Sequence, residues 1–347
     1  MAGNRDIGSE TLPGKVERGT EVPDEPAAGR EATPGEPPKG RGSGEGMEDP
    51  SHTARALWAL LEPLHAVTYF APEARQAFED AGLHGFWRGY FAGRAAPLGE
   101  TGPEPVTAAF FGFAPAMVAR ALPGLWAVVT PGRALEARRT GAGAALRRLL
   151  SGYGREVEEA AGLLLPVVRD LDCAGRVLAA ANRALPVPPG PVERLWHAAT
   201  VLREHRGDGH VAALVAAGFD GCEILVLRAG ADLPRAELQP YRGWSDDAWR
   251  AAGRRLAARG LLDPRGGATA EGLRAHRAVE EATDRAAARP WQGLDASARD
   301  RLRRLLVPLA RASAAALRFP NPMGLPAPAG EMTDVSGPQV PGSGRSA

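Results

Sequence analysis

Apolar residues recur at helical spacing through most of this chain, and segments that alternate apolar with polar residues are scarce. The pattern is clearest in residues 53–64, 72–81, 135–150, 157–185 and 297–319. Apolar residues three and four positions apart lie on one face of an α-helix, whereas a half-buried strand requires strict alternation. The periodicity therefore predicts a mainly α-helical fold.

Shifts in composition divide the chain into segments. Residues 1–50 and 320–347 are rich in glycine and proline and have few large apolar side chains. Such segments cannot bury enough surface to offset the entropy lost on ordering, so we expect both tails to be disordered. The sequence PVPPGP at 186–191 breaks any helix, and it predicts a linker between two helical domains at 51–185 and 192–319.

Charge and cysteine content limit the classes of partner and compartment. Residues 1–50 carry a charge of −5 and residues 320–347 carry −1, so a total of +1 leaves +7 on the helical body. A mildly basic body is compatible with nucleic acid but does not require it. Cys173 and Cys222 provide neither a disulfide framework nor a zinc site. Because the sequence shows no signal peptide and no apolar run of membrane-spanning length, we expect a cytoplasmic protein with no membrane partner.

The segment that starts at Ser245 has the pattern of a well-delimited helix. Ser245 is suited to cap a helix whose apolar face comprises Trp249, Ala252 and Leu256. That helix should end at Gly260, because glycine readily adopts the left-handed conformation found just after a helix.

The residues that follow predict a short β-hairpin and a further helix. The sequence PRGG at 264–267 is a turn cluster with room only for a small hairpin. Thr269 is suited to cap a long polar helix that ends near Arg289. Helix, hairpin and helix together outline a winged helix-turn-helix with a short wing, at about 234–291 in the C-terminal half.

Three other stretches resemble a known family. Residues 62–70 (EPLHAVTYF), 85–99 (GFWRGYFAGRAAPLG) and 205–210 (HRGDGH) resemble the SalK-type helix-turn-helix family of actinobacterial proteins, whose members are largely uncharacterised. The C-terminal unit is similar to the winged helix of MarR-type regulators. Residues 256–262 match the end of their recognition helix, and residues 268–272 match the junction that follows their wing. The resemblance therefore implies a regulator-like protein.

Two features depart from the MarR-type pattern. The turn at 264–267 is much shorter than a typical wing, which argues against a minor-groove contact by its tip. Asp246 and Asp247 place negative charge where a recognition helix would first meet phosphates. Both features weaken the prediction of DNA binding.

The helix that follows Ser245 has an arginine-rich face opposite its apolar face. The arginines on this face and in the following turn are Arg250, Arg254, Arg255, Arg259 and Arg265. Arginine contacts phosphates and reads guanine, so these five are the candidate DNA-binding residues. The alternative is a solvated amphipathic helix, because arginine is almost the only basic residue that this chain uses.

A second candidate site combines aromatic and charged residues of the N-terminal half. Its members are Glu62, His65, Tyr69, Trp87, Tyr90 and Arg94. Buried together, they would suit a small anionic or aromatic ligand. Alternatively, they are core residues that satisfy one another's hydrogen bonds. Glu62 and His65 have the Glu-x-x-His spacing of di-iron bundles, but the motif occurs only once, so we expect no metal and no cofactor.

The stretch at 205–210 contains two histidines and two glycines. His205 and His210, together with His197 upstream, leave metal binding open. The glycines at 207 and 209 predict a tight turn, with Asp208 capping a helix that starts near Val211.

The leading functional hypothesis is a winged-helix DNA-binding transcription regulator, or a regulator-like binding protein that responds to a ligand. Its partners would be double-stranded DNA and a second copy of this chain. The alternative is a small-molecule-binding protein or enzyme that uses the aromatic pocket, with the winged helix serving only packing or dimerisation. No nucleophile elbow, phosphate loop or dinucleotide glycine motif is present, so no catalytic residue is predicted and an enzyme is not favoured.

Overall fold

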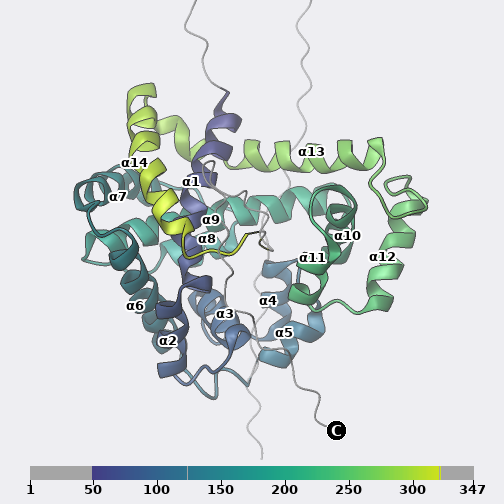
Figure 1. Ribbon diagram of the computed structural model, residues 1–347, viewed down its shortest axis with the longest axis horizontal. Helices are drawn as coiled ribbons and strands as arrows, with labels where there is room; N and C mark the ends of the chain where they lie inside the picture. Colours follow the sequence, from purple (N-terminus) through teal and green to yellow (C-terminus); the bar gives the residue numbers. More distant parts are fainter. Residues whose placement is uncertain (1–48, 123, 320, 322–347) are drawn as a thin grey trace, which may run out of the picture. The chain divides into compact units, whose positions relative to one another are not determined.

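The computed structural model describes residues 49–122, 124–319 and 321, and these residues are mainly helical, as the periodicity predicted (Figure 1). The α-helices are α1 Pro50–Phe70, α2 Pro72–Asp80, α3 Phe86–Ala95, α4 Pro103–Phe110, α5 Pro115–Ala121, α6 Pro131–Leu149, α7 Gly154–Arg169, α8 Val177–Arg183, α9 Pro191–Ala216, α10 Gly221–Ala231, α11 Arg235–Arg242, α12 Asp246–Ala258, α13 Ala270–Ala286 and α14 Ala296–Ala314. Two short 3₁₀ helices, Ala96–Leu98 and Arg289–Gly293, complete the described structure. Apart from residues 49, 50 and 321, the expected disordered tails lie outside the described residues.

Proline and capping residues mark where several helices begin. α2 starts at Pro72 and α9 at Pro191, positions where the missing N–H of proline costs no helical hydrogen bond. The Ser245 hydroxyl accepts a hydrogen bond from the Ala248 N–H at 3.2 Å and caps α12. The Thr269 hydroxyl accepts one from the Gly272 N–H at 3.1 Å and caps α13. The predicted starts of α2, α12 and α13 are confirmed, whereas α9 begins at the last residue of the predicted linker.

The predicted β-hairpin wing is wrong. Within the described residues there is no β-strand, and residues 262 and 268 form only an isolated bridge. The Asp263 carboxylate accepts hydrogen bonds from the N–H groups of Arg265 at 2.8 Å and Gly267 at 2.9 Å, which closes a compact turn. Two backbone hydrogen bonds join the arms, from Asp263 N–H to the Gly267 carbonyl at 2.8 Å and from Thr269 N–H to the Leu261 carbonyl at 3.1 Å. The Ala268 N–H points away from the other arm and donates to the Gly230 carbonyl of α10 at 3.0 Å.

The predicted tight turn at 207–209 is also wrong, because α9 runs unbroken through both glycines. A Cβ on Gly209 would lie 2.5 Å from a guanidinium nitrogen of Arg176. Arg176 crosses α9 here and donates to the main-chain carbonyls of His205 and Ala286. Gly209 therefore allows another side chain to pass close to the helix.

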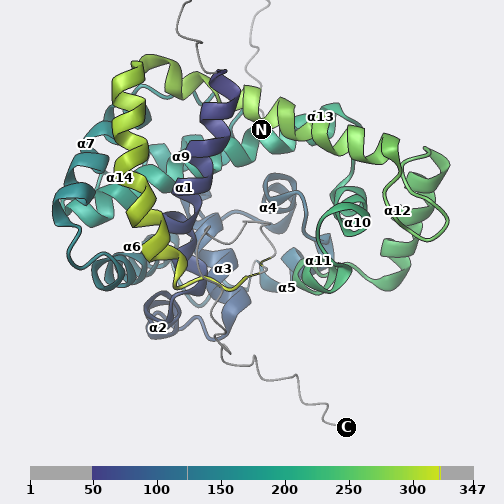
Figure 2. The same ribbon diagram turned by 45° about the horizontal axis from the view of Figure 1, so that its top comes forward.

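α9 is the helix around which much of the molecule packs. It contacts α1, α6, α7, α8 and α13, which come from both sides of the proline-rich stretch at 186–191. α1 also lies beside α14, as both views show (Figures 1 and 2). α13 extends from the end of the α12 region back to α1 and α9 (Figure 2). The predicted division into two helical domains stays a prediction.

Buried apolar residues form three main clusters. One lies among α1, α6, α7, α9 and α14, and a second is formed largely by α2 to α6. The third surrounds α10, α11 and α12 and contains the predicted apolar face of α12. None of the helices described here is both long enough and apolar enough to cross a membrane alone, although α9 and α10 meet those criteria as a pair bent by 95°.

Candidate functional site

α11 and α12 form a helix-turn-helix that packs against α10. α10 contacts both helices, and α11 is followed by Gly243, which adopts the left-handed conformation with φ of 74°. Trp244 and Ser245 then lead into α12. The turn leaves no space for a side chain at Gly243, where a Cβ would lie 2.7 Å from the Cβ of Met117 in α5. Two helices joined by such a short turn make the supersecondary unit that presents its second helix to a partner.

The inner face of α12 is fixed by apolar packing. Trp249, Ala252 and Leu256 are buried in the cluster that also contains Leu227 of α10 and Leu238 of α11. These are the positions that the helical spacing predicted to face inward. The orientation of α12 about its own axis follows from this packing, and its opposite face points outward.

Two of the predicted DNA-binding arginines are exposed on the outer side of α12. Arg250 forms an ion pair with Asp247 one turn earlier in the same helix. Arg254 is exposed, and it makes no hydrogen bond or ion pair with another residue of the described part of the chain. Its guanidinium is therefore available to a partner.

Arg255 of α12 and Arg259, which directly follows this helix, are bonded to the start of α10. Arg255 donates from Nε to Glu223 at 2.7 Å and also pairs with Asp220. Arg259 pairs with Glu223 at 3.4 Å and lies over the Phe219 ring, with 4.7 Å between its guanidinium carbon and the ring centre. Asp220 and Glu223 also form the capping box of α10. Arg255 and Arg259 therefore hold α12 against α10.

The remaining predicted contact, Arg265, lies on the exposed turn that replaces the wing. Its backbone N–H donates to Asp263, which fixes the turn. The acidic start of α12 is partly neutralised, because Asp246 forms an ion pair with Arg235 of α11. The helix-turn-helix surface thus has fewer uncompensated charges than its sequence suggests.

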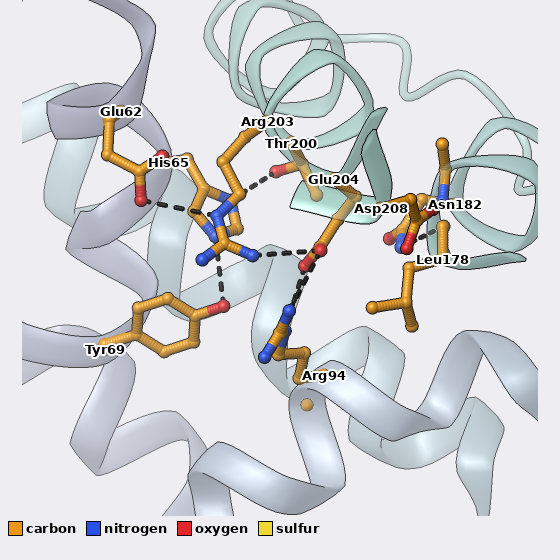
Figure 3. A network of polar contacts seen from close by, with 12 residues as sticks. Glu62, His65, Tyr69, Arg94, Leu178, Asn182, Thr200, Arg203, Glu204 and Asp208 are labelled. Carbon is orange, nitrogen blue, oxygen red and sulfur yellow. Dashed lines mark hydrogen bonds and ion pairs between the residues drawn. The ribbon is translucent and has the colours of Figure 1, made fainter. Parts of the chain in front are cut away.

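The second candidate site contains a network of charged groups buried between α1, α3 and α9 (Figure 3). Arg94 donates to both oxygens of Glu204, from Nε at 3.1 Å and from Nη2 at 3.2 Å. Arg203 donates to Glu204 at 2.9 Å and to Glu62 at 3.3 Å. Burial opposes ionisation of Glu204, but Arg203 and Arg94 outweigh it and lower the pKa of that carboxyl. Glu204 is therefore a buried carboxylate shared by two arginines.

His65 and Tyr69 adjoin this network. His65 contacts the Thr200 hydroxyl through Nδ1 and the Tyr69 hydroxyl through Nε2, each at 3.0 Å. Burial lowers the pKa of His65 well below its usual value and, together with other groups, raises the pKa of Tyr69. Both side chains are accordingly neutral at pH 7 and act as hydrogen-bonding groups.

The six predicted ligand residues are brought together only in part. Tyr90 accepts a hydrogen bond from Arg94 at 3.2 Å, and its ring centre lies 5.7 Å from that of Trp87. Tyr69, Phe86 and Tyr90 line a cavity of about 20 Å³. This cavity has room for about one water molecule. The other four predicted residues do not line this cavity, namely Glu62, His65, Trp87 and Arg94. Ligand binding at these residues stays a prediction.

Sequence reasoning missed the part of this network that α9 contributes. Thr200, Arg203 and Glu204 are buried or half-buried, yet α9 shows no single apolar stripe because different faces contact different helices. One signal in the sequence could have identified this contribution. Arg203 and Glu204 are adjacent charged residues in a helical segment that is otherwise rich in apolar residues. Three His, Cys, Asp or Glu side chains grouped as in a metal site do not occur in the described residues.

Asp208 of α9 also has a different role from the predicted one. Its carboxylate accepts a hydrogen bond from the Ala179 N–H at 2.9 Å, so it caps α8 from outside (Figure 3). Burial raises the pKa of Asp208 to about 6.

Comparison with known proteins gives one match. A family model described as a helix-turn-helix family matches residues 54–320. No curated protein and no solved structure matches the chain. The matched segment includes both the α11–α12 unit and the helices that carry the buried network.

Proposed function

This chain belongs to a helix-turn-helix family, and on that premise we propose that it is a transcription regulator that binds double-stranded DNA. α12 enters the major groove, which admits an α-helix. A second copy of the chain would present a second α12 to a neighbouring half-site. The finer resemblance to SalK-type and MarR-type proteins remains a prediction.

The observation that carries this proposal is the contrast between the two sides of α12. Arg255 and Arg259 are bonded to α10, whereas Arg254 is exposed and without a partner among the described residues. Arg250 can exchange Asp247 for a phosphate, because an exposed ion pair contributes little to stability. We therefore assign Arg250 and Arg254 to DNA contact, with Arg265 beside them, and Arg255 and Arg259 to orienting the helix.

The test is selection of bound sequences from a random pool of double-stranded DNA, followed by affinity measurement at two salt concentrations. The Arg250→Ala/Arg254→Ala double variant should bind the selected DNA roughly tenfold or more weakly, and its affinity should depend less on salt. Failure of the unaltered protein to enrich any DNA would contradict the proposal. So would equal affinity for the double variant.

The chain offers a matched control for Arg250. Arg139 of α6 is half-buried, with 38% of its side chain exposed, and it pairs with Glu136 one turn earlier in its own helix. Arg139→Ala removes the same kind of ion pair at a site away from α12 and should leave DNA affinity unchanged.

The second predicted function is binding of a small anionic or aromatic ligand, and its support is the small cavity beside Tyr69 and Tyr90. The cavity beside Tyr69 and Tyr90 is too small for such a ligand unless a neighbouring side chain moves. Phe86, which is 37% exposed, and Arg75, which is also exposed, are lining residues with freedom to do so. Native mass spectrometry of protein purified from its host tests this directly, since a bound ligand would appear as added mass.

A further inference from the structure

Residues 110–114, which comprise the last residue of α4 and the link to α5, touch both arms of the helix-turn-helix turn and are called the connector below. The Gly112 carbonyl accepts a hydrogen bond from Trp244 Nε1 at 2.9 Å. The Ala114 N–H donates to the carbonyl of Arg242 at 2.8 Å. These two bonds lie on either side of Gly243, where the chain turns from α11 towards α12. The connector therefore fixes the turn from which α12 projects.

The other side of the connector packs against the buried network. The Arg94 guanidinium lies over the Phe110 ring, with 4.1 Å to the ring centre, and Arg94 is bonded to Glu204. The Phe113 ring centre lies 5.5 Å from that of Tyr90. A continuous series of contacts thus runs from Glu204 through Arg94, Phe110 and Gly112 to Trp244.

The connector has a backbone conformation that only its surroundings can maintain. Phe111 has φ of 49° and ψ of −59°, and it is the only non-glycine residue with positive φ in the part of the chain that the structure describes. The Gly112 N–H donates to the Phe110 carbonyl at 2.6 Å, which closes a three-residue turn of the rare, strained kind. A Cβ on Gly221, the first residue of α10, would lie only 2.1 Å from the Phe111 carbonyl oxygen. The connector is therefore packed tightly against the start of α10 as well.

We infer that the connector couples the buried Arg94–Glu204 network to the orientation of α12. Under this inference, which rests on the proposed DNA binding, Arg94 and Trp244 are positioning residues for that binding. A shift of Arg94 displaces Phe110, and the closed turn passes the displacement to the Gly112 carbonyl that holds Trp244. Closely packed interiors switch between discrete arrangements instead of deforming gradually, so a small change at the network can alter the α12 angle.

A double-mutant cycle tests the coupling. Glu204→Gln weakens the hold on Arg94, and Trp244→Phe removes the N–H that binds the connector while keeping an aromatic ring. Each single variant should bind the selected DNA about tenfold more weakly. Adding Glu204→Gln to Trp244→Phe should then cost less than threefold more, because the connection is already broken. Fold-changes that multiply would overturn the inference.

Amide hydrogen exchange of the DNA-free protein provides a second readout. Glu204→Gln should raise exchange in residues 243–258, and it should do so much less when Trp244 is already phenylalanine. This arm separates the two proposals, since it can succeed for a protein that binds no DNA. Unchanged exchange in residues 243–258 of the Glu204→Gln variant would contradict the coupling even if DNA binding were confirmed.

Two further variants keep the result interpretable. Trp126→Phe removes another indole-to-carbonyl hydrogen bond, from Nε1 to the Thr101 carbonyl at 3.0 Å, and should affect neither DNA affinity nor α12 exchange. If Glu204→Gln does not fold, Phe110→Leu replaces it, because it removes the ring beneath Arg94 without changing a buried charge. The same non-additivity with Trp244→Phe is then expected, and additive effects would again count against the coupling.

Discussion

At the scale of single residues, two buried histidines of α9 should make stability sensitive to acid. His197 and His205 are 4% and 3% exposed, and burial lowers the pKa of each to about 4. The unfolded chain, in which an imidazole has a pKa of 6.5, takes up protons first as the pH falls. The free energy of unfolding is therefore unaffected by these two histidines above pH 6.5. It falls as the pH is lowered towards 4, by at most about 3 kcal/mol for each histidine.

Urea denaturation at pH 7.5 and pH 5 measures this effect. His197→Gln cannot take up the proton, so its stability should fall less between the two pH values than that of the unaltered protein. Exposed His84 provides the control, and His84→Gln should leave the pH dependence as it was. An unchanged slope for His197→Gln would show that this histidine is already protonated in the folded state.

Asp208 contributes in the opposite direction. Burial raises the pKa of its carboxyl to about 6, above the value of 3.8 for an unfolded chain. Ionisation of Asp208 therefore costs stability as the pH rises from 4 to 6. His197 and His205 together have a larger effect than Asp208 alone. The sum of the three contributions is a lower free energy of unfolding in acid.

Residue-level chemistry was the least predictable part of the sequence. The arginines of α12 were identified, but the pairing of Arg255 and Arg259 depends on Asp220 and Glu223, some thirty residues earlier in the chain. Their positions could be read only once α10 was known to pack on α12. Arg203 and Glu204 were missed for the same reason, since their partners lie on α1 and α3.

At the scale of secondary-structure elements, the interior glycines of two helices should respond oppositely to alanine. Gly162 in α7 has open space around its Cβ position, so Gly162→Ala should stabilise the protein by about 0.5–1 kcal/mol through helix propensity. In α9, Gly209→Ala should destabilise it, because the new Cβ would displace Arg176 from its hydrogen bonds to two main-chain carbonyls.

Thermal denaturation of the two alanine variants measures the difference. Because both glycines lie inside helices, any effect of helix propensity alone is the same for both. Stabilisation by Gly209→Ala would mean that Arg176 moves aside at no cost.

Helices were predictable where local signals determine them. The cap residues Ser245 and Thr269 and the apolar positions of α12 behave as their spacing indicated. The two errors came from tertiary contacts. Arg176 explains why α9 passes through a glycine pair that resembles a turn, and the Asp263 carboxylate closes the turn that resembled a β-hairpin.

At the scale of the whole molecule, the last described helix completes the core that the first begins. Leu306 of α14 is fully buried in the cluster that contains Leu57, Leu61 and Leu64 of α1. Leu306→Ala should lower the free energy of unfolding by about 2–5 kcal/mol, and it should raise amide exchange in α1 as well as in α14.

The neighbouring residue offers a matched control. Val307 is 40% exposed, and Val307→Ala should cost little and leave exchange in α1 unchanged. If Leu306→Ala raised exchange in α14 alone, the two ends of the chain would be unfolding separately.

The contact between α1 and α14 has a consequence during protein synthesis. About 240 residues separate the end of α1 from the end of α14. At a synthesis rate of about 5–20 residues per second, roughly 12–50 s pass before the ribosome has produced the partner that covers α1. For that interval the apolar side of the first helix has to be shielded by nascent neighbours or by a chaperone. We therefore expect the yield of folded protein to depend on the supply of chaperones, even though the described part of the chain is mainly helical.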